Sequence, residues 1–199
     1  MYNPRDSYWL RAKKKGYRSR ASFKLLELNE KYKLIRNGNR VLDIGAFPGG
    51  WMQVALEIVG EKGFIFGVDI EDIKSFNKLN CEFIKADILN TNDIKYLLGR
   101  IKNKVDVVIS DVAPNTTGIK FTDQVNSLKL SKQAFSLSKL VLKKGGNFLV
   151  KVFQSSEVVN FFKEIGKDFN ETRITKPEAT RKGSAEVYLV GKGFKGSAG

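Results

Sequence analysis

The feature that most restricts how this chain can fold is an alternation of short apolar segments with longer amphipathic ones. Five apolar segments have the length and composition of buried strands, and most of the segments between them carry apolar residues at helical spacing. The expected strands span residues 41–44, 64–69, 81–85, 105–110 and 147–153, and the expected helices span residues 22–33, 51–59, 93–101, 124–142 and 155–165. This alternation predicts an open, mostly parallel α/β sheet with helices on both faces and ligands at the carboxyl ends of its strands.

The end of the chain departs from this alternation. Residues 169–175 and 186–191 have the composition of strands, and no helical segment separates them, so we expect them to pair antiparallel. The 199 residues suit one domain, which we expect to span residues 1–199. Within it we expect a basic arm over about residues 1–20 and a flexible tail over about residues 192–199, which is rich in glycine and lysine.

The composition excludes several classes of chemistry. Histidine is absent, which rules out Ser-His-Asp hydrolysis, Cys-His proteolysis and catalysis by a histidine-bound metal. The single cysteine, Cys81, can form neither an internal disulfide nor a cysteine-rich zinc site. We therefore expect no metal centre, and any acid–base step must use carboxylates, lysine, tyrosine or water.

The charge balance indicates a polyanionic partner. The chain carries 35 lysines and arginines against 21 acidic residues, a formal net charge of +14, and nucleic acid is the usual partner of such an excess. The alternatives are a basic surface that only aids solubility and an anionic membrane surface. No long basic amphipathic helix, apolar run of about 20 residues or signal peptide supports a membrane, so we expect a cytoplasmic protein.

Cations alternate with aromatic residues in the first 20 positions. The cations are Arg5, Arg11, Lys13, Lys14, Lys15, Arg18 and Arg20, and the aromatic residues are Tyr2, Tyr8, Trp9 and Tyr17. Cations can contact phosphates and aromatic rings can stack on unpaired bases, which suits RNA. A solvated helix face with aromatic residues docked on the core explains the same pattern, and the two interpretations are compatible.

The first expected strand runs into a glycine-rich turn over residues 43–51, with the sequence Asp-Ile-Gly-Ala-Phe-Pro-Gly-Gly-Trp. Such a turn between a strand and a helix lets a ligand approach the backbone closely. The dinucleotide fingerprint G-x-G-x-x-G, started at Gly45, would need glycine where Phe47 stands, which disfavours NAD and FAD. A cofactor without phosphates tolerates Phe47, and S-adenosylmethionine is such a cofactor.

Aspartates recur at the ends of the first three expected strands, as Asp43, Asp69 and Asp87. An acidic residue at the position of Asp69 commonly accepts hydrogen bonds from ribose hydroxyls. Asp87 is placed to meet an adenine amino group. Each aspartate alone is also explained as a helix cap or a solvated loop carboxylate. Three in series favour a nucleoside-binding edge.

Five blocks of sequence then form a specific pattern. They are GYRSRASFKL at 16–25, DIGAFPGGW at 43–51, DVAPN at 111–115, VKVFQ at 150–154, and the segment from Lys176-Pro177 to SAEVY at 184–188. In this order they resemble the FtsJ/RrmJ family of ribose 2'-O-methyltransferases over nearly the whole chain. The resemblance implies a Rossmann-like S-adenosylmethionine methyltransferase fold, with a mostly parallel seven-stranded sheet whose last strand is antiparallel.

The resemblance also implies site residues. The family's catalytic Lys-Asp-Lys-Glu tetrad falls on Lys24, Asp111, Lys151 and Glu186. Its cofactor contacts fall on Gly49, Trp51, Asp69, Asp87 and Asp111, with Gly45 shaping the turn. The departures are Phe47 where a small residue is common, Thr116 and Thr117 after the Asp-x-Ala-Pro-Asn block, and Thr180 for a frequent serine. None of these positions belongs to the tetrad.

These residue types suit the transfer of a methyl group to a ribose hydroxyl. The hydroxyl is a weak acid, so the enzyme must align it and remove its proton. Without histidine, a lysine can be the base when burial or a nearby cation lowers its pKa. We expect Lys151 to be this base, Lys24 to supply the neighbouring charge, Asp111 to orient Lys151, and Glu186 to hold Lys24 or the ribose. The alternative is two structural Lys–carboxylate pairs, which are poor stabilisers when buried.

The sequence leaves the substrate open. By resemblance, a uridine of large-subunit ribosomal RNA, free or in the ribosomal subunit, is favoured over the anticodon loop of tRNA, and Arg20, Arg181 and Lys182 are expected to meet its phosphates. A monomer is expected. The alternatives of other classes are a non-catalytic RNA-binding assembly factor, which should have lost a tetrad residue or the glycine turn, and a nicotinamide dehydrogenase.

Overall fold

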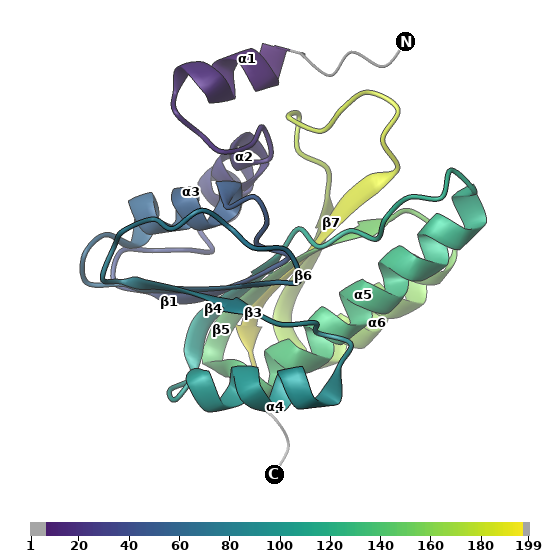
Figure 1. The fold of residues 1–199 in the computed structure, drawn as a ribbon. Coiled ribbons are helices and arrows are strands. Elements are labelled where there is room, and N and C mark those ends of the chain that lie inside the picture. The colour runs from purple at the N-terminus through teal and green to yellow at the C-terminus, as the bar shows by residue number, and fades with distance from the viewer. Residues whose placement is uncertain (1–6, 197–199) are drawn as a thin grey trace.

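A computed structural model describes residues 7–196, so the arm residues Tyr2 and Arg5 and the end of the predicted tail lie outside the described part. Seven strands form one mixed sheet in the order β3-β2-β1-β4-β5-β7-β6 (Figure 1). The strands are β1 (Arg40–Ile44), β2 (Phe64–Asp69), β3 (Cys81–Lys85), β4 (Val105–Ser110), β5 (Leu142–Phe153), β6 (Phe169–Thr175) and β7 (Glu186–Phe194). The helices are α1 (Ser7–Lys14), α2 (Ser22–Tyr32), α3 (Gly50–Val59), α4 (Thr91–Arg100), α5 (Lys120–Val141) and α6 (Glu157–Asp168). The predicted fold class is confirmed.

The strand order reverses between β1 and β4, at the centre of the sheet. β1 pairs in parallel with β2 on one side and with β4 on the other, so that Ile44 lies opposite both Val68 and Ser110. β4 then pairs in parallel with β5, with Ser110 beside Val150. The carboxyl ends of these strands therefore lie side by side at the switch point, where sheets of this kind bind ligands.

β7 brings the last part of the chain to this same edge. It pairs antiparallel with β6, as the absence of a helix between the last two strands predicted, and also with β5. Because β7 runs against β5, its first residues lie at the carboxyl end of β5, with Glu186 beside Phe153 and Tyr188 beside Lys151.

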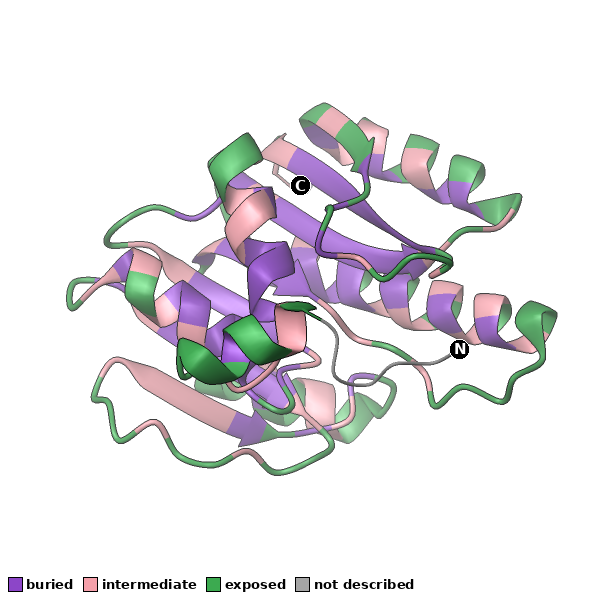
Figure 2. Ribbon diagram, turned by 90° about the horizontal axis from the view of Figure 1, so that it is seen from above, coloured by how far each residue is buried: buried purple, intermediate pink, exposed green. Residues whose placement is uncertain are grey.

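Apolar side chains on the two faces of the sheet build two separate cores. One face packs against α4, α5 and α6, and the other packs against α2 and α3 (Figure 1). The sheet is mostly buried, while the outward faces of the helices are exposed (Figure 2). Alternate residues of β1 serve opposite cores: Leu42 and Ile44 face the first core and Val41 faces the second.

The predicted tail begins too early, because β7 continues to Phe194. Glycine and lysine in this segment predicted a flexible tail, but tertiary packing holds residues 192–194 in the strand. The ring of Phe194 lies 5.4 Å from that of Phe169 between centroids, and Gly191 packs flat against Phe169. Residues 192–194 are therefore the end of a central strand.

Helix α5 starts four residues earlier than its apolar pattern predicted. The carboxylate of Asp123 accepts hydrogen bonds from the backbone N–H groups of Thr117 (2.7 Å) and Gly118 (3.2 Å), which fixes the turn before the helix.

Over residues 7–196, no helix combines the length and the apolarity that crossing a membrane requires. Within the same range, no group of three histidine, cysteine or acidic side chains could hold a metal ion.

The packing of Gly191 predicts a stability effect. A Cβ at this position would lie 2.7 Å from Cγ of Phe169, so Gly191→Ala should lower the free energy of unfolding by about 1–3 kcal/mol through overpacking. Chemical denaturation measures the change. Gly99→Ala in α4 is the matched control, because a Cβ there meets nothing within 4 Å and should stabilise the helix by up to about 1 kcal/mol. Equal effects of the two substitutions would contradict the packing argument.

Candidate active site

The predicted tetrad residues come together at the carboxyl edge of the sheet. Asp111 directly follows β4, and Lys151 lies on the neighbouring β5. Lys151 Nζ lies 3.0 Å from Oδ1 of Asp111 and donates a hydrogen bond of 2.6 Å to the backbone carbonyl of Asp111. The side chain of Lys151 is 7% exposed and that of Asp111 is 16% exposed, so this is a nearly buried ion pair.

The second predicted pair joins α2 to β7. Lys24 Nζ forms an ion pair with Oε1 of Glu186, the first residue of β7, and both side chains are nearly buried. The ammonium group of Lys24 also lies 5.9 Å from the centroid of the Tyr188 ring. The two lysine–carboxylate pairs are therefore neighbours in one cluster.

Tyr188, for which no role was predicted from the sequence, links the two pairs. Its hydroxyl donates a hydrogen bond of 2.7 Å to Oδ1 of Asp111. Glu186 and Tyr188 are two residues apart on β7, so both face the cluster. The spacing of two residues could have indicated that Tyr188 faces the same side of the strand as Glu186. Its hydrogen-bond partner, Asp111, follows a different strand, β4, and cannot be identified from that spacing.

The cluster keeps Asp111 charged and Tyr188 neutral. Burial alone would raise the pKa of the Asp111 carboxyl, but the charges of Lys151 and Lys24, with the hydrogen bond from Tyr188, hold this pKa below its usual value. Burial and the nearby carboxylates of Asp111 and Glu186 raise the pKa of Tyr188 well above its usual value. The tyrosine hydroxyl therefore keeps its proton and acts as a donor.

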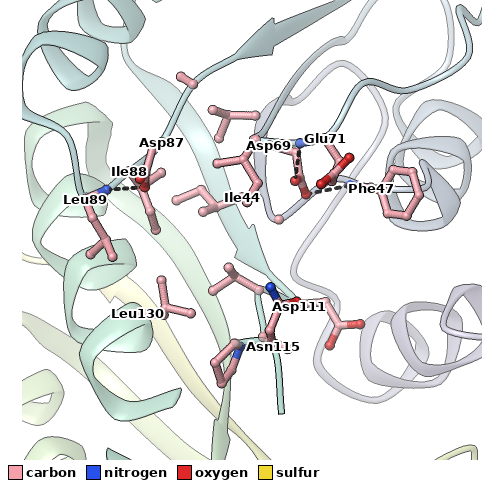
Figure 3. A pocket seen from close by; sticks show the side chains of 17 residues that line it. Ile44, Phe47, Asp69, Glu71, Asp87, Ile88, Leu89, Asp111, Asn115 and Leu130 are labelled. Carbon is pink, nitrogen blue, oxygen red and sulfur yellow. Dashed lines mark hydrogen bonds between the residues drawn. The ribbon is translucent and has the colours of Figure 1, made fainter. Parts of the chain in front are cut away.

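A pocket of about 390 Å³ opens beside this cluster, at the ends of β1 to β4 (Figure 3). Four of the predicted cofactor residues line it: Gly45, Asp69, Asp87 and Asp111. Asp69 accepts hydrogen bonds from the backbone N–H groups of Phe47 (2.8 Å) and Glu71 (3.0 Å), and Asp87 accepts one from Leu89 (2.8 Å). These bonds fix both carboxylates at the wall, and carboxylates there suit the hydroxyls and amine of an adenosine.

The glycine turn forms one edge of the pocket. Gly45 has φ +80°, and a Cβ there would lie 2.6 Å from Cα of Val112, so this position requires glycine. The other two predicted cofactor residues, Gly49 and Trp51, are not among the residues that line the pocket. The indole of Trp51 is buried behind the turn, where it stacks on Tyr188 and donates a hydrogen bond of 2.9 Å to the carbonyl of Ala21.

Arg18, which was expected to be a cation of the RNA-contacting arm, is instead engaged within the protein. Its guanidinium donates hydrogen bonds to the carbonyls of Lys74 (2.5 Å) and Ser75 (3.0 Å) and lies 3.5 Å from the centroid of the Phe76 ring. It therefore holds the loop between β2 and β3 beside the glycine turn, and an added Cβ on Gly49 would meet it at 2.7 Å. This loop begins with Ile70 and Glu71, which line the pocket.

Within the described arm, the two tyrosine rings dock on the protein while most of the cations face solvent. Tyr8 and Tyr17 each lie against Phe23, with centroids 5.6 and 5.7 Å apart. The side chains of Arg11, Lys13, Lys14 and Lys15 are exposed. Docking on the core therefore accounts for the two tyrosine rings, while these four cations stay accessible to an anion.

Arg20 joins the arm to the loop between β6 and β7. It donates a hydrogen bond of 2.5 Å to the carbonyl of Ala179, and burial lowers its pKa, with a further lowering by the charge of Arg181 that Glu186 opposes. Two cations that influence each other in this way must lie close together. Arg20 and Arg181 therefore lie near each other and near Glu186 of the tetrad.

Asp43 lies under the glycine turn and is fully buried. Neither carboxylate oxygen has a well-formed hydrogen bond among the described residues, although the nearby backbone N–H of Met52 favours the ion slightly. Burial, followed by the charges of Asp111 and Asp69, raises the pKa of Asp43 well above its usual value.

The raised pKa of Asp43 predicts a pH-dependent stability. The folded protein binds this proton more tightly than the unfolded chain does, so the contribution is complete below the unfolded pKa of about 4 and is lost as the pH rises through the folded pKa. Asp43→Asn cannot lose a proton, so its melting temperature should improve relative to the wild type as the pH rises from 4 to 8. A difference between the two proteins that stays constant with pH would contradict the raised pKa.

The contacts of Arg18 predict a role in cofactor affinity. Arg18→Ala should release the loop at Lys74–Phe76 and weaken binding of S-adenosylmethionine about tenfold, or about 1.4 kcal/mol, measured by calorimetry. Arg18→Lys should also weaken it, because lysine cannot reproduce the two-pronged contact. The control is Lys14→Ala, which removes an exposed cation from α1. Wild-type affinity in both Arg18 variants would show that the loop holds without this residue.

Comparisons with known proteins agree with this geometry. Residues 17–194 match the FtsJ-like methyltransferase family. A relative from Methanothermobacter thermautotrophicus, named ribosomal RNA large subunit methyltransferase E, is 47% identical over 192 residues, which are 96% of this chain and 91% of the relative.

Solved structures show the same fold. A Plasmodium falciparum structure, assigned as a ribosomal RNA methyltransferase, is 32% identical with a TM-score of 0.80 and covers 90% of this chain and 100% of its own. A Streptococcus mutans methyltransferase-like protein in complex with SAH is 12% identical with a TM-score of 0.56, covering 85% and 97%, and this likeness shows the fold alone. The family match over nearly the whole chain establishes that the protein belongs to the FtsJ-like methyltransferase family, with S-adenosylmethionine as its cofactor.

Proposed function

We propose that this protein transfers a methyl group to a ribose 2'-hydroxyl in RNA and that Lys151 is the general base. The observation that carries the proposal is the nearly buried ammonium of Lys151, held between the carboxylate and the backbone carbonyl of Asp111 beside the pocket. A chain without histidine has few other groups that could take a proton at this edge of the sheet.

The pocket has the features that S-adenosylmethionine requires. Asp69 and Asp87 would hold its ribose hydroxyls and adenine amine, and Asp111 would place a negative charge near its sulfonium. When bound, the cofactor supplies a methyl group already activated by the positive sulfur. The protein therefore has to position the hydroxyl and accept its proton.

Lys151 is held so that it can do this. Two of the three N–H positions of its ammonium are engaged by Asp111, which leaves one for the substrate hydroxyl. In the neutral amine form, the lone pair of Nζ would accept the proton that the 2'-hydroxyl loses as its oxygen is methylated. Asp111, fixed by Tyr188, then stabilises the ammonium that results.

Lys24 and Glu186 complete the proposed centre. Lys24 adds a second positive charge to the cluster beside Asp111, and Glu186 keeps Lys24 in place. Arg20 and Arg181 lie near Glu186, and with the exposed Lys182 next in the chain they would meet the phosphates that flank the target ribose.

The proposed RNA is that of the large ribosomal subunit, with a uridine as the target. Relatives that carry the name ribosomal RNA large subunit methyltransferase E and are 47% identical support this choice. The anticodon loop of tRNA is the second candidate. A cytoplasmic monomer is part of the same proposal. All four tetrad residues and the glycine turn are present, which disfavours a non-catalytic assembly factor.

The test uses labelled S-adenosylmethionine with total tRNA, purified ribosomal RNA and undermethylated large ribosomal subunits, followed by digestion to identify the modified nucleoside. We expect a 2'-O-methyl nucleoside in ribosomal RNA or the subunit. Lys151→Ala should reduce the rate by about 10²–10⁴ and flatten its rise with pH, because the base is gone.

Lys163→Ala, an exposed position on α6, is the control and should be fully active. Melting curves and cofactor binding show whether Lys151→Ala is folded. A folded variant with the wild-type rate and pH profile would refute Lys151 as the base. Methylation of a nucleobase in place of a ribose would refute the reaction.

A further inference from the structure

A second charged pocket lies at the opposite end of the sheet from the proposed active site. Its volume is also about 390 Å³, and its walls come from the segment before β1, the start of β5 and the end of β7. β7 runs from Glu186 in the tetrad to Lys192 in this pocket, six residues further on. At about 3.4 Å per residue, the two sites lie roughly 20 Å apart along the sheet.

The lining of this pocket is strongly basic. It contains four cations, Arg36, Lys143, Lys144 and Lys192, and a single acidic residue, Asp106. Asp106 is already engaged, because Oδ1 lies 2.6 Å from Lys143 Nζ. Arg36, Lys144 and Lys192 form no ion pair with any of the residues in the described range 7–196, and none of the three is fully buried.

The carboxylate opposite Lys192 in the sheet does not neutralise the pocket either. Glu171 of β6 stands opposite Lys192 in the sheet, but its Oε1 pairs with Arg173 at 3.2 Å. Three cations that converge without counter-charges repel one another, and this repulsion is relieved when an anion binds.

The backbone that carries these cations is held firmly. A register shift in β5 bulges Lys143–Gly146 out of the ladder, and Gly145 adopts φ +83°. The side chain of Asn147 donates a hydrogen bond of 2.8 Å to the carbonyl of Leu34. Asp106 accepts one of 2.7 Å from the backbone N–H of Arg40. The cations thus stand on fixed supports from three separate segments.

We propose that this pocket is a second contact site for the phosphate backbone of the RNA substrate. Cations from three segments suit several successive phosphates better than one small anion, and the chain as a whole carries a charge of +14. The inference rests on the proposed function. RNA that reaches both ends of the sheet must be large and folded, so the enzyme should favour structured ribosomal RNA or the ribosomal subunit over a short oligonucleotide.

The test is the salt dependence of RNA binding. The variant Arg36→Ala/Lys144→Ala/Lys192→Ala is compared with Lys62→Ala/Lys102→Ala/Lys132→Ala, which removes three exposed cations elsewhere. Filter binding to large-subunit ribosomal RNA between 50 and 200 mM salt should give the pocket variant about tenfold weaker binding at low salt and a log–log slope shallower by about 2 to 3. The control should keep a slope close to that of the wild type.

A short RNA with the same target nucleotide supplies the second readout. The pocket variant should methylate it at the wild-type rate while losing activity on full-length RNA. Equal salt slopes for the two triple variants, or equal losses on short and long RNA, would overturn the proposal. So would loss of binding to anionic phospholipid vesicles with RNA binding unchanged. The binding readout needs no catalysis, so its failure is distinguishable from failure of the proposed reaction.

Discussion

The contact between Asp111 and Lys151 is the constraint on which the rest of the site depends. Removing two charges from water costs several kcal/mol per ion, and a buried pair recovers this only with good geometry and further hydrogen bonds. Here Tyr188 supplies the further bond to Asp111. Asp111 follows β4, and Lys151 and Tyr188 lie on β5 and β7, so Tyr188 reaches the pair because β7 runs antiparallel beside β5. A buried pair of this kind contributes little to the free energy of unfolding.

Two buried aspartates show how partners decide the state of a carboxyl group. Asp111 has cations on two sides, and its pKa falls, whereas Asp43 lies under the glycine turn without a cation, and its pKa rises. Asp111 also acts on Asp43, because the negative charge of Asp111 is one reason that the pKa of Asp43 is raised. The positive charge of Lys151 and Lys24 thus concentrates the negative charge on Asp111, next to the pocket.

The sequence was most informative where local pattern and chemistry agree. Strand alternation predicted the sheet, and the motif resemblance predicted which lysines and carboxylates meet. What it missed depends on contacts between distant residues. In the sequence, Arg18 is one more cation of a basic arm. In the structure, its guanidinium is bound to the loop at residues 74–76. The strand at residues 192–194 reads as a tail, because the ring of Phe169 that covers it belongs to another strand. Such contacts between distant residues cannot be predicted from local composition.

The segment that leads into α2 connects parts of the site that could otherwise move independently. Arg18 holds the loop beside the cofactor pocket, Arg20 holds the loop between β6 and β7, and Lys24 pairs with Glu186 at the end of that loop. These residues lie within seven positions of one another. A displacement of the segment therefore changes the loop that lines the pocket and the tetrad together. RNA bound at the exposed cations of α1, as the sequence predicts, would act on this same segment. Any resulting change in cofactor affinity must, by linkage, be matched by an equal effect of the cofactor on RNA affinity.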